Sequence, residues 1–224
     1  MRELLFVNYR VEPELLVDLV PRHSKPDTRI DSAGRETAFV SAVCFRVAEV
    51  SSSLLRLPRL SFEQVNYRAY IRMGEVPAVY FFDMKVNSRA IAALTTFLRA
   101  PIQFEDIVLT TGTIETVGDV DYVFRSPGFE VRAVIPGHPD AASEDTPPDF
   151  ITHRLVGYAG SEGNLYKIEV DHPMLGAISA RIESARAPRL EQLGLLTPDE
   201  SSRPSSALYV REALFKTKPP TRER

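Results

Sequence analysis

A row of polar side chains is the part of the sequence best suited to hold a small ligand. Residues 62–73 alternate in polarity, so that Gln64, Asn66, Arg68 and Tyr70 share one face of an expected strand. An arginine can donate paired hydrogen bonds to a carboxylate, and amide and phenol groups beside it can orient the ligand. If enclosed, this face would line a cavity that grips a carboxylate. If it faces water, it is an ordinary polar surface.

The start of an expected helix is a second place where an anion could bind. Ser88 is placed to cap this helix, and Asn87 and Arg89 flank its start. Free backbone N–H groups and the helix dipole favour negative charge there, so a carboxylate or phosphate could dock. The alternative for both residues is helix capping combined with a surface ion pair.

Three residues are candidates for acid–base or amine chemistry. Lys85 ends an expected strand, and alternation places it with Phe81 and Asp83, so it would otherwise pair with Asp83 or reach solvent. His172 precedes a proline and is either a catalytic group or an ordinary hydrogen-bonded histidine. Glu63 is adjacent to the polar row but points to the opposite face.

Several kinds of site have no support in the sequence. The four histidines are widely spread and Cys44, the only cysteine, lies in an apolar run, so we expect no metal and a buried, inert thiol. There is no glycine-rich phosphate loop after a strand and no G-x-S-x-G motif. Nucleotide chemistry and serine hydrolysis are unsupported, and no cofactor is expected.

Composition limits the partners and the compartment. The chain has 224 residues, 44% of them apolar, with a formal net charge of -3 and a pI near 5.9, which gives no reason to expect nucleic-acid binding. Its apolar stretches are too short for a secretory signal or a membrane span. The sequence therefore predicts a cytoplasmic protein with a small anionic or apolar partner, no nucleic acid and no membrane. Assembly into a homo-oligomer stays open.

The elements that would position these side chains are mostly strands. Strands or extended segments are expected over residues 3–9, 36–50, 62–73, 78–85, 107–113, 122–125, 129–135, 150–159, 164–171, 174–187 and 207–215. Short helices are expected after Pro13, after Ser88 and over residues 190–196. This order predicts an α+β fold with a mostly antiparallel sheet. We predict one domain over residues 1–215 and a disordered tail over residues 216–224.

Three segments of the chain resemble acetoacetate decarboxylase and a YqjF-like bacterial family of unknown function. They are RELLFVNYRVEPELLVDLVP from Arg2, QVNYRAYIR from Gln64 and PAVYFFDMKVNSRA from Pro77. FITHRLVGY and IEVDHP more weakly resemble a family arginine, here Arg154, and a histidine–proline pair. The resemblance to this acetoacetate decarboxylase-like superfamily implies a cone-like β-barrel with flanking helices. It also implies an interior pocket for a small carboxylate.

The same resemblance implies lost chemistry. In the decarboxylase a pair of lysines follows the proline that matches Pro101, and an amine there forms a Schiff base; here Ile102 and Gln103 follow it. Gln64 stands where relatives have glutamate, and Arg2 matches a functional arginine. The resemblance and the polar patterns together make the ligand-binding candidates Arg2, Gln64, Arg68, Tyr70, Asn87, Arg89, Gln103 and Arg154.

Three functions fit these observations. The first is a protein that has kept the pocket, has lost the Schiff-base lysine and binds a small anionic or apolar ligand. The second is a lyase or hydrolase acting on keto or enol acids, with its acid or base supplied by Lys85, His172 or Glu63. The third is a non-catalytic oligomeric scaffold. None of the three includes acetoacetate decarboxylation through an iminium.

Overall fold

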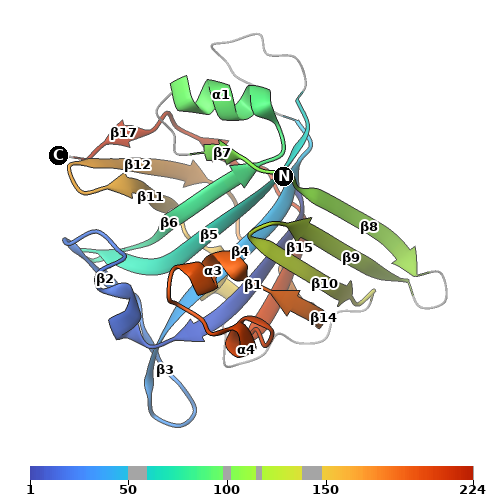
Figure 1. The fold of residues 1–224 in the computed structure, drawn as a ribbon, viewed down its shortest axis with the longest axis horizontal. Helices are drawn as coiled ribbons and strands as arrows, with labels where there is room; N and C mark the ends of the chain where they lie inside the picture. The colour runs from blue at the N-terminus through green and yellow to red at the C-terminus, as the bar shows by residue number, and fades with distance from the viewer. Residues whose placement is uncertain (50–59, 98–101, 115–117, 138–147, 224) are drawn as a thin grey trace.

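The protein is built around two β-sheets (Figure 1). The structure is a computed structural model, and it describes residues 1–49, 60–97, 102–114, 118–137 and 148–223. Strands dominate this part of the chain and almost all of them pair antiparallel, as the sequence predicted.

The larger sheet has the strand order β13-β15-β1-β4-β5-β6-β11-β12-β16, and short strands flank this path. Among the described strands, the parallel pairs are β6 with β7 and β6 with β11. The path does not return to its first strand within the described residues, so closure into a cone-like barrel stays a prediction. The strands are β1 (Arg2–Val11), β2 (Ser24–Pro26), β3 (Arg29–Ile30), β4 (Glu36–Val47), β5 (Phe62–Met73), β6 (Val76–Val86), β7 (Ile102–Phe104), β11 (Val156–Ser161), β12 (Asn164–Asp171), β13 (Ile178–Ser179), β15 (Ser206–Glu212), β16 (Lys216–Thr217) and β17 (Thr221–Arg222).

The smaller sheet has the order β14-β10-β9-β8 and packs beside the larger one (Figure 1). Its strands are β8 (Val108–Ile114), β9 (Asp119–Ser126), β10 (Phe129–Ile135) and β14 (Arg181–Arg186). The helical segments are η1 (Pro13–Leu16), α1 (Arg89–Phe97), α2 (Pro148–Thr152), α3 (Pro188–Gln192) and α4 (Pro198–Ser201). None of the described helices has both the length and the apolar character needed to cross a membrane.

The large sheet is buried on both faces at its centre. One face packs against the small sheet and α3, with Tyr67 of β5, Phe124 of β9 and Leu190 of α3 in one apolar cluster. The opposite face carries a second cluster that includes Phe6 of β1 and Ile91 of α1. Strand β4 is buried over nearly its whole length, as its run of β-branched and aromatic residues predicted. The candidate site lies on the second face.

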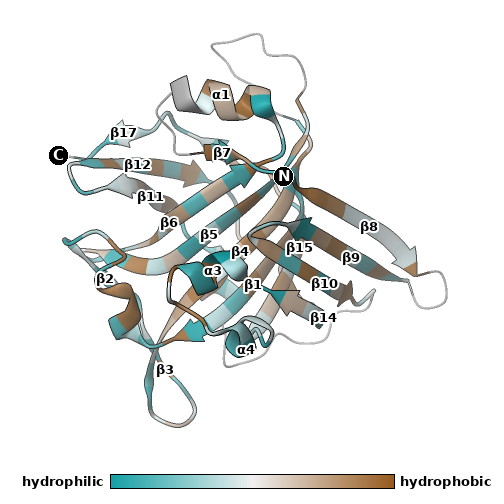
Figure 2. Cartoon of the chain, in the orientation of Figure 1, coloured by the Kyte–Doolittle hydropathy of each residue, from teal (hydrophilic) through white to brown (hydrophobic). Residues whose placement is uncertain are grey.

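A β-bulge in β6 decides which side chains reach that face. Tyr67 pairs with Asp83 and the next residue, Arg68, pairs with Phe81, so Phe82 is the extra residue. Strict alternation predicted Phe81 and Lys85 on one face. The bulge turns Phe81 to the face of Arg68, while Asp83 and Lys85 point the other way, so that prediction was wrong. Figure 2 shows hydrophilic and hydrophobic residues alternating along β5 and β6.

Residues 216–222, which the sequence predicted to be part of a disordered tail, pair with the large sheet. Strands β16 and β17 both pair with β12, two residues each. The composition of the tail is charged and rich in proline, but the exposed edge of β12 supplies backbone partners that a local pattern cannot reveal. The chain end therefore lies beside β12 (Figure 1).

Four other local predictions differ from the structure or lie outside it. Phe150 belongs to the short helix α2, not to the start of a strand, and the expected extended segment 174–187 divides between β13 of the large sheet and β14 of the small one. Helix α4 was not predicted, although Thr197 and Glu200 form its capping box. Val50 and Pro101 fall outside the described residues.

Candidate functional site

A cavity of about 350 Å³ lies on the face of the large sheet turned away from the small sheet. Strands β1, β4, β5, β6 and β12 contribute to its wall, together with α2 and the last residues of the chain. This volume is within the range typical of small-molecule sites. The wall is mainly apolar, and the polar side chains in it are Gln64, Asn66, Arg68, Thr95, Thr152, Arg154, His172, Thr217 and Lys218.

Arg68 is the most unusual group in this wall. It is 9% exposed, and one of its terminal nitrogens donates to the Tyr70 hydroxyl at 2.9 Å and to the Ile151 carbonyl at 2.9 Å. Its buried Nε has no hydrogen-bond partner, and no carboxylate of the described residues pairs with it. The guanidinium instead stacks near aromatic rings, 5.2 Å from the centroid of Phe6. Arg68 therefore brings an unneutralised positive charge to the cavity.

Tyr70 holds Arg68 in place and is not itself part of the cavity wall. The Tyr70 hydroxyl lies 2.8 Å from Ser41 Oγ, which donates to Asn8 Oδ1 at 2.6 Å. Asn8, Ser41 and Tyr70 are fully buried. This chain of hydrogen bonds crosses β1, β4 and β5, so it fixes the position of the guanidinium by satisfying buried polar groups.

Arg154 also lines the cavity, but its charge is neutralised in place. Its Nη1 lies 2.6 Å from Asp27 Oδ2, and its Nε donates to the Phe150 carbonyl at 2.8 Å. Burial lowers the pKa of Arg154, and the hydrogen bond to Asp27 opposes that shift. The arginine and its partner form a buried ion pair beside the cavity, which leaves Arg68 as the arginine able to attract an anion.

Gln64 and Asn66 continue the polar wall along β5. Gln64 Nε2 donates to Asn66 Oδ1 at 2.7 Å, and both side chains reach the cavity. Because an amide carries no charge, this end of the wall can donate or accept without repelling an anion at Arg68. Gln64 and Arg68 are both buried. This part of the polar row that the sequence predicted is therefore enclosed and does not face open solvent.

His172 is the titratable ring in the wall. It is 7% exposed, and its Nδ1 lies 2.8 Å from the Pro173 carbonyl oxygen. A carbonyl can only accept, so Nδ1 carries the proton and the neutral ring keeps Nε2 as an acceptor. The rings of Phe215 and His153 lie at centroid distances of 4.8 Å and 5.7 Å. His172 is thus a histidine whose Nδ1 is engaged and which, like Arg154, lines the cavity.

Four predicted ligand-binding residues lie away from the cavity. Arg2 is 58% exposed at its side chain and pairs with Glu212 at 3.2 Å. Asn87 bonds with the side chain and backbone of Glu63. Arg89 stacks over Phe104, and Gln103 accepts a hydrogen bond from Lys85. Their binding of a ligand is untested, but the structure does not bring them to Arg68.

The two other acid–base candidates are engaged elsewhere. Lys85 Nζ lies 3.1 Å from Asp83 Oδ1, as the alternative interpretation of this lysine predicted. Glu63 Oε1 pairs with Arg46 Nε at 3.1 Å. Neither lines the cavity. Ile102, by contrast, does line it, so the first residue after Pro101 faces the cavity and the second, Gln103, is exposed.

Sequence reasoning missed part of the wall. Phe81 reaches the cavity because of the bulge in β6, which alternation could not anticipate. Phe215 and Lys218 reach it because the chain end pairs with β12. The only available signal was the basic character of residues 216–222 opposite the acidic residues of β12.

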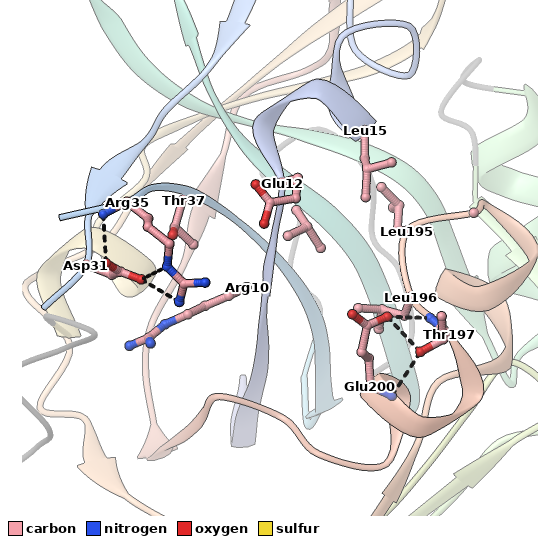
Figure 3. A pocket seen from close by; sticks show the side chains of 12 residues that line it. Arg10, Glu12, Leu15, Asp31, Arg35, Thr37, Leu195, Leu196, Thr197 and Glu200 are labelled. Carbon is pink, nitrogen blue, oxygen red and sulfur yellow. Dashed lines mark hydrogen bonds and ion pairs between the residues drawn. The ribbon is translucent and has the colours of Figure 1, made fainter. Parts of the chain in front are cut away.

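A second hollow of about 400 Å³ lies between η1, the β3–β4 hairpin and the turn before α4 (Figure 3). Asp31 and Arg35 pair on one side at 3.0 Å, and Thr197 and Glu200 bond to each other on the other side. Arg35 and Glu200 are exposed, and Asp31, Arg35 and Glu200 already have partners. This hollow lacks the combination of enclosure and unneutralised charge found at Arg68.

The described residues contain no group of three or more His, Cys, Asp or Glu side chains placed to hold a metal ion. Cys44 is buried and free, and burial raises the pKa of its thiol. The position of Cys44 agrees with the inert thiol that the sequence predicted.

The fold is that of acetoacetate decarboxylase-like proteins. The enduracididine biosynthesis enzyme MppR complexed with pyruvate shares 15% identity at a TM-score of 0.58, covering 96% of this chain and 85% of that one. An acetoacetate decarboxylase-like enzyme from Sphingomonas wittichii RW1 shares 14% identity at a TM-score of 0.59, covering 99% of this chain and 90% of that one. Acetoacetate decarboxylase from Legionella pneumophila shares 12% identity at a TM-score of 0.59, covering 97% of this chain and 82% of that one.

The chain belongs to the family DUF2071, described as an uncharacterized conserved protein, which matches residues 1–212. No curated protein matches it. The predicted resemblance to a family of unknown function, and to the acetoacetate decarboxylase-like superfamily, is therefore confirmed. At these identities the solved structures establish the fold alone.

Proposed function

We propose that the chain binds a small carboxylate with an apolar body in this cavity, and that it does not decarboxylate through an iminium. The observation that carries the proposal is Arg68, a buried guanidinium with an unpartnered Nε and no described carboxylate beside it. A buried charge without a counter-ion is costly, so an anionic ligand would be stabilised there by charge and by hydrogen bonds.

The rest of the wall suits the other end of such a ligand. Phe6, Phe45, Phe81 and Leu175 present apolar surface to the same space. Burying an alkyl or aryl group against it would add roughly 25 cal/mol per Å² of apolar surface removed from water. A ligand with one carboxylate and a short apolar tail therefore satisfies both parts of the wall.

The absence of an amine at the matching position argues against Schiff-base chemistry. Ile102 cannot form an iminium, and the lysine at the cavity, Lys218, donates to Glu169 at 2.6 Å and is 76% exposed at its side chain. Desolvation that would keep an amine neutral does not act on a side chain so exposed. This supports a binding function with no iminium step.

A second candidate function rests on His172. Of the three acid–base candidates it is the one in the cavity wall, and its Nδ1–H···O=C bond leaves Nε2 available as a proton acceptor. On this alternative the chain is a lyase or hydrolase acting on keto or enol acids. His172→Gln would then abolish turnover while leaving carboxylate binding measurable.

Calorimetry with matched ligands tests the binding proposal. The ligands are octanoate and its neutral analogue octanamide, and Gln64→Glu places a negative charge in the cavity wall, on the face of β5 that carries Arg68. We expect octanoate to bind wild type and to weaken by about tenfold, ~1.4 kcal/mol, in the variant, because a like charge repels the carboxylate. Octanamide should change far less.

The control is Gln192→Glu, the same substitution at an exposed position of α3. It should leave octanoate binding unchanged. Equal weakening of both ligands by Gln64→Glu would contradict recognition of the charge. If neither these ligands nor a wider panel of small carboxylates raises the melting temperature, the scaffold function is favoured instead.

A further inference from the structure

Residues 213–222, named here the C-terminal strap, connect two distant parts of the large sheet. The strap leaves β15, which lies beside β1, and within four residues reaches β16, which pairs with β12 at the opposite end of the strand order. At the first residue of the strap, Ala213, the backbone N–H and C=O both form hydrogen bonds with Met1. The strap therefore joins the two ends of the strand order along the cavity, which residues of β1 and β12 also line.

The strap forms part of the cavity wall. Phe215, Thr217, Lys218 and Pro220 all line the cavity, and the Phe215 ring lies 4.8 Å from that of His172. These four side chains come from one short segment, whereas the rest of the wall comes mainly from long, well-paired strands. Displacing the strap would remove this part of the wall and leave the pairing of β1, β4, β5 and β6 in place.

The strap is held by short and separate contacts. Each of β16 and β17 pairs with β12 over two residues, and Pro219 and Pro220 between them have no N–H group to continue the ladder. An exposed ion pair, Lys218 Nζ to Glu169 Oε2 at 2.6 Å, lies at the rim. Segments with few buried contacts open locally at much lower free energy than the sheet they rest on.

We propose that the C-terminal strap is the gate of the cavity: it closes over a bound ligand and must detach from β12 for the ligand to enter or leave. This inference rests on the proposed function, because a gate needs a ligand. The Lys218–Glu169 pair is the latch. Its position at the rim means that breaking it frees the strap without removing a group that contacts the buried charge of Arg68.

A reversible cross-link between strap and sheet gives the direct test. Asp171 and Lys216 are opposite each other in the β12–β16 pair, and neither lines the cavity. Directly opposed residues of antiparallel strands lie within the distance that a disulfide can bridge. The double variant Asp171→Cys with Lys216→Cys can be compared, oxidised and reduced, in stopped-flow binding of the apolar anion 8-anilinonaphthalene-1-sulfonate.

We expect the oxidised form to bind and release the probe at least about tenfold more slowly than the reduced form, with a smaller change in affinity. Equal rates in both forms would overturn the gate. Binding of the probe by the reduced form is checked first, with displacement by octanoate. If the probe does not bind, the proposed function is contradicted. If it binds, but with equal binding and release rates in the two forms, only the gate is contradicted.

The latch is tested separately with single substitutions. Lys218→Gln should speed probe release severalfold, and Glu169→Gln should do the same, because each breaks the ion pair. The double variant should be no faster than either single variant if the pair acts as one unit. Lys216→Gln is the matched control, because this neighbouring lysine forms no ion pair among the described residues and does not line the cavity. Equal release rates in Lys218→Gln and wild type would contradict the latch.

Discussion

At the scale of single residues, the site depends on one arginine whose charge is left uncompensated. Two arginines of the described residues lie in the cavity wall, and among these residues only Arg154 of the two has a carboxylate partner, Asp27. The hydrogen bonds that Arg68 donates to the Tyr70 hydroxyl and the Ile151 carbonyl hold it without neutralising it. Because the cost of a buried charge falls when an anion binds, this difference between the two arginines favours a ligand at Arg68.

Position 102 offers a residue-scale prediction about the missing amine. Ile102→Lys puts a lysine in the cavity wall, where burial and the charge of Arg68 lower an amine pKa, so it should form an imine with acetoacetate. We expect borohydride to trap this adduct covalently, detected by mass spectrometry. Gln103→Lys, at the adjacent exposed position, should not be trapped. Equal labelling of the two variants, or labelling of wild type, would contradict the assignment of position 102 to the cavity.

At the scale of elements, β5 and β6 separate two different polar environments. One face of this strand pair carries Arg68 toward the cavity, and the other carries Asp83, which pairs with Lys85 at 3.1 Å and with Arg189 of α3 at 2.8 Å. Glu105, which follows β7, belongs to this second group, and burial raises its pKa while Ser126 and Lys85 oppose the shift. The bulge at Phe82 is what keeps the two groups on opposite faces.

At the same scale of elements, Glu105 gives a prediction about how the free energy of unfolding depends on pH. The unfolded chain loses this proton near the ordinary glutamate pKa of 4.5, whereas the folded protein holds it to higher pH. Between the two values the folded state binds more protons, so the free energy of unfolding falls as pH rises through that window. Glu105→Gln should remove this fall, measured by urea unfolding between pH 4.5 and 8.

The control for this measurement is Glu130→Gln, an exposed glutamate of the small sheet. Its profile should follow that of wild type. Parallel profiles for wild type and Glu105→Gln would show that Glu105 ionises alike in the folded and unfolded chains.

At the scale of the whole molecule, one cluster of apolar residues joins the two sheets and α3. Tyr67 of the large sheet lies under the β9–β10 turn of the small sheet, and Gly128 in that turn also accepts a hydrogen bond from the Arg189 backbone. A Cβ at position 128 would lie 2.5 Å from the Tyr67 hydroxyl and 3.3 Å from Arg189 Cβ. The turn, the large sheet and α3 therefore meet at a point with no room for a side chain.

Gly128→Ala accordingly tests how closely the sheets are packed. We expect a loss of about 1–3 kcal/mol in the free energy of unfolding, because the added methyl forces the sheets or α3 apart. Gly112→Ala is the matched control, since a Cβ there meets nothing within 4 Å on β8 of the same sheet. Urea unfolding of both variants measures the difference. Equal stability of the two variants would contradict the close packing.

The sequence by itself determined the local elements and the polar row. Alternation predicted the strand over residues 62–73 with its correct bounds, and placed Gln64 and Arg68 on one face, because side-chain direction in a strand is a local property. A resemblance over short motifs also pointed to the superfamily whose fold the structure shares.

Only the tertiary structure decided what surrounds that row. The bulge at Phe82, the enclosure of Arg68 and the pairing of the C-terminal strap with β12 each depend on partners distant in sequence. No local pattern records which edge strand a charged chain end will meet, since its backbone groups pair as readily with water as with a strand. The sequence therefore identifies the polar row of the wall, while long-range pairing supplies the rest of the wall and encloses the cavity.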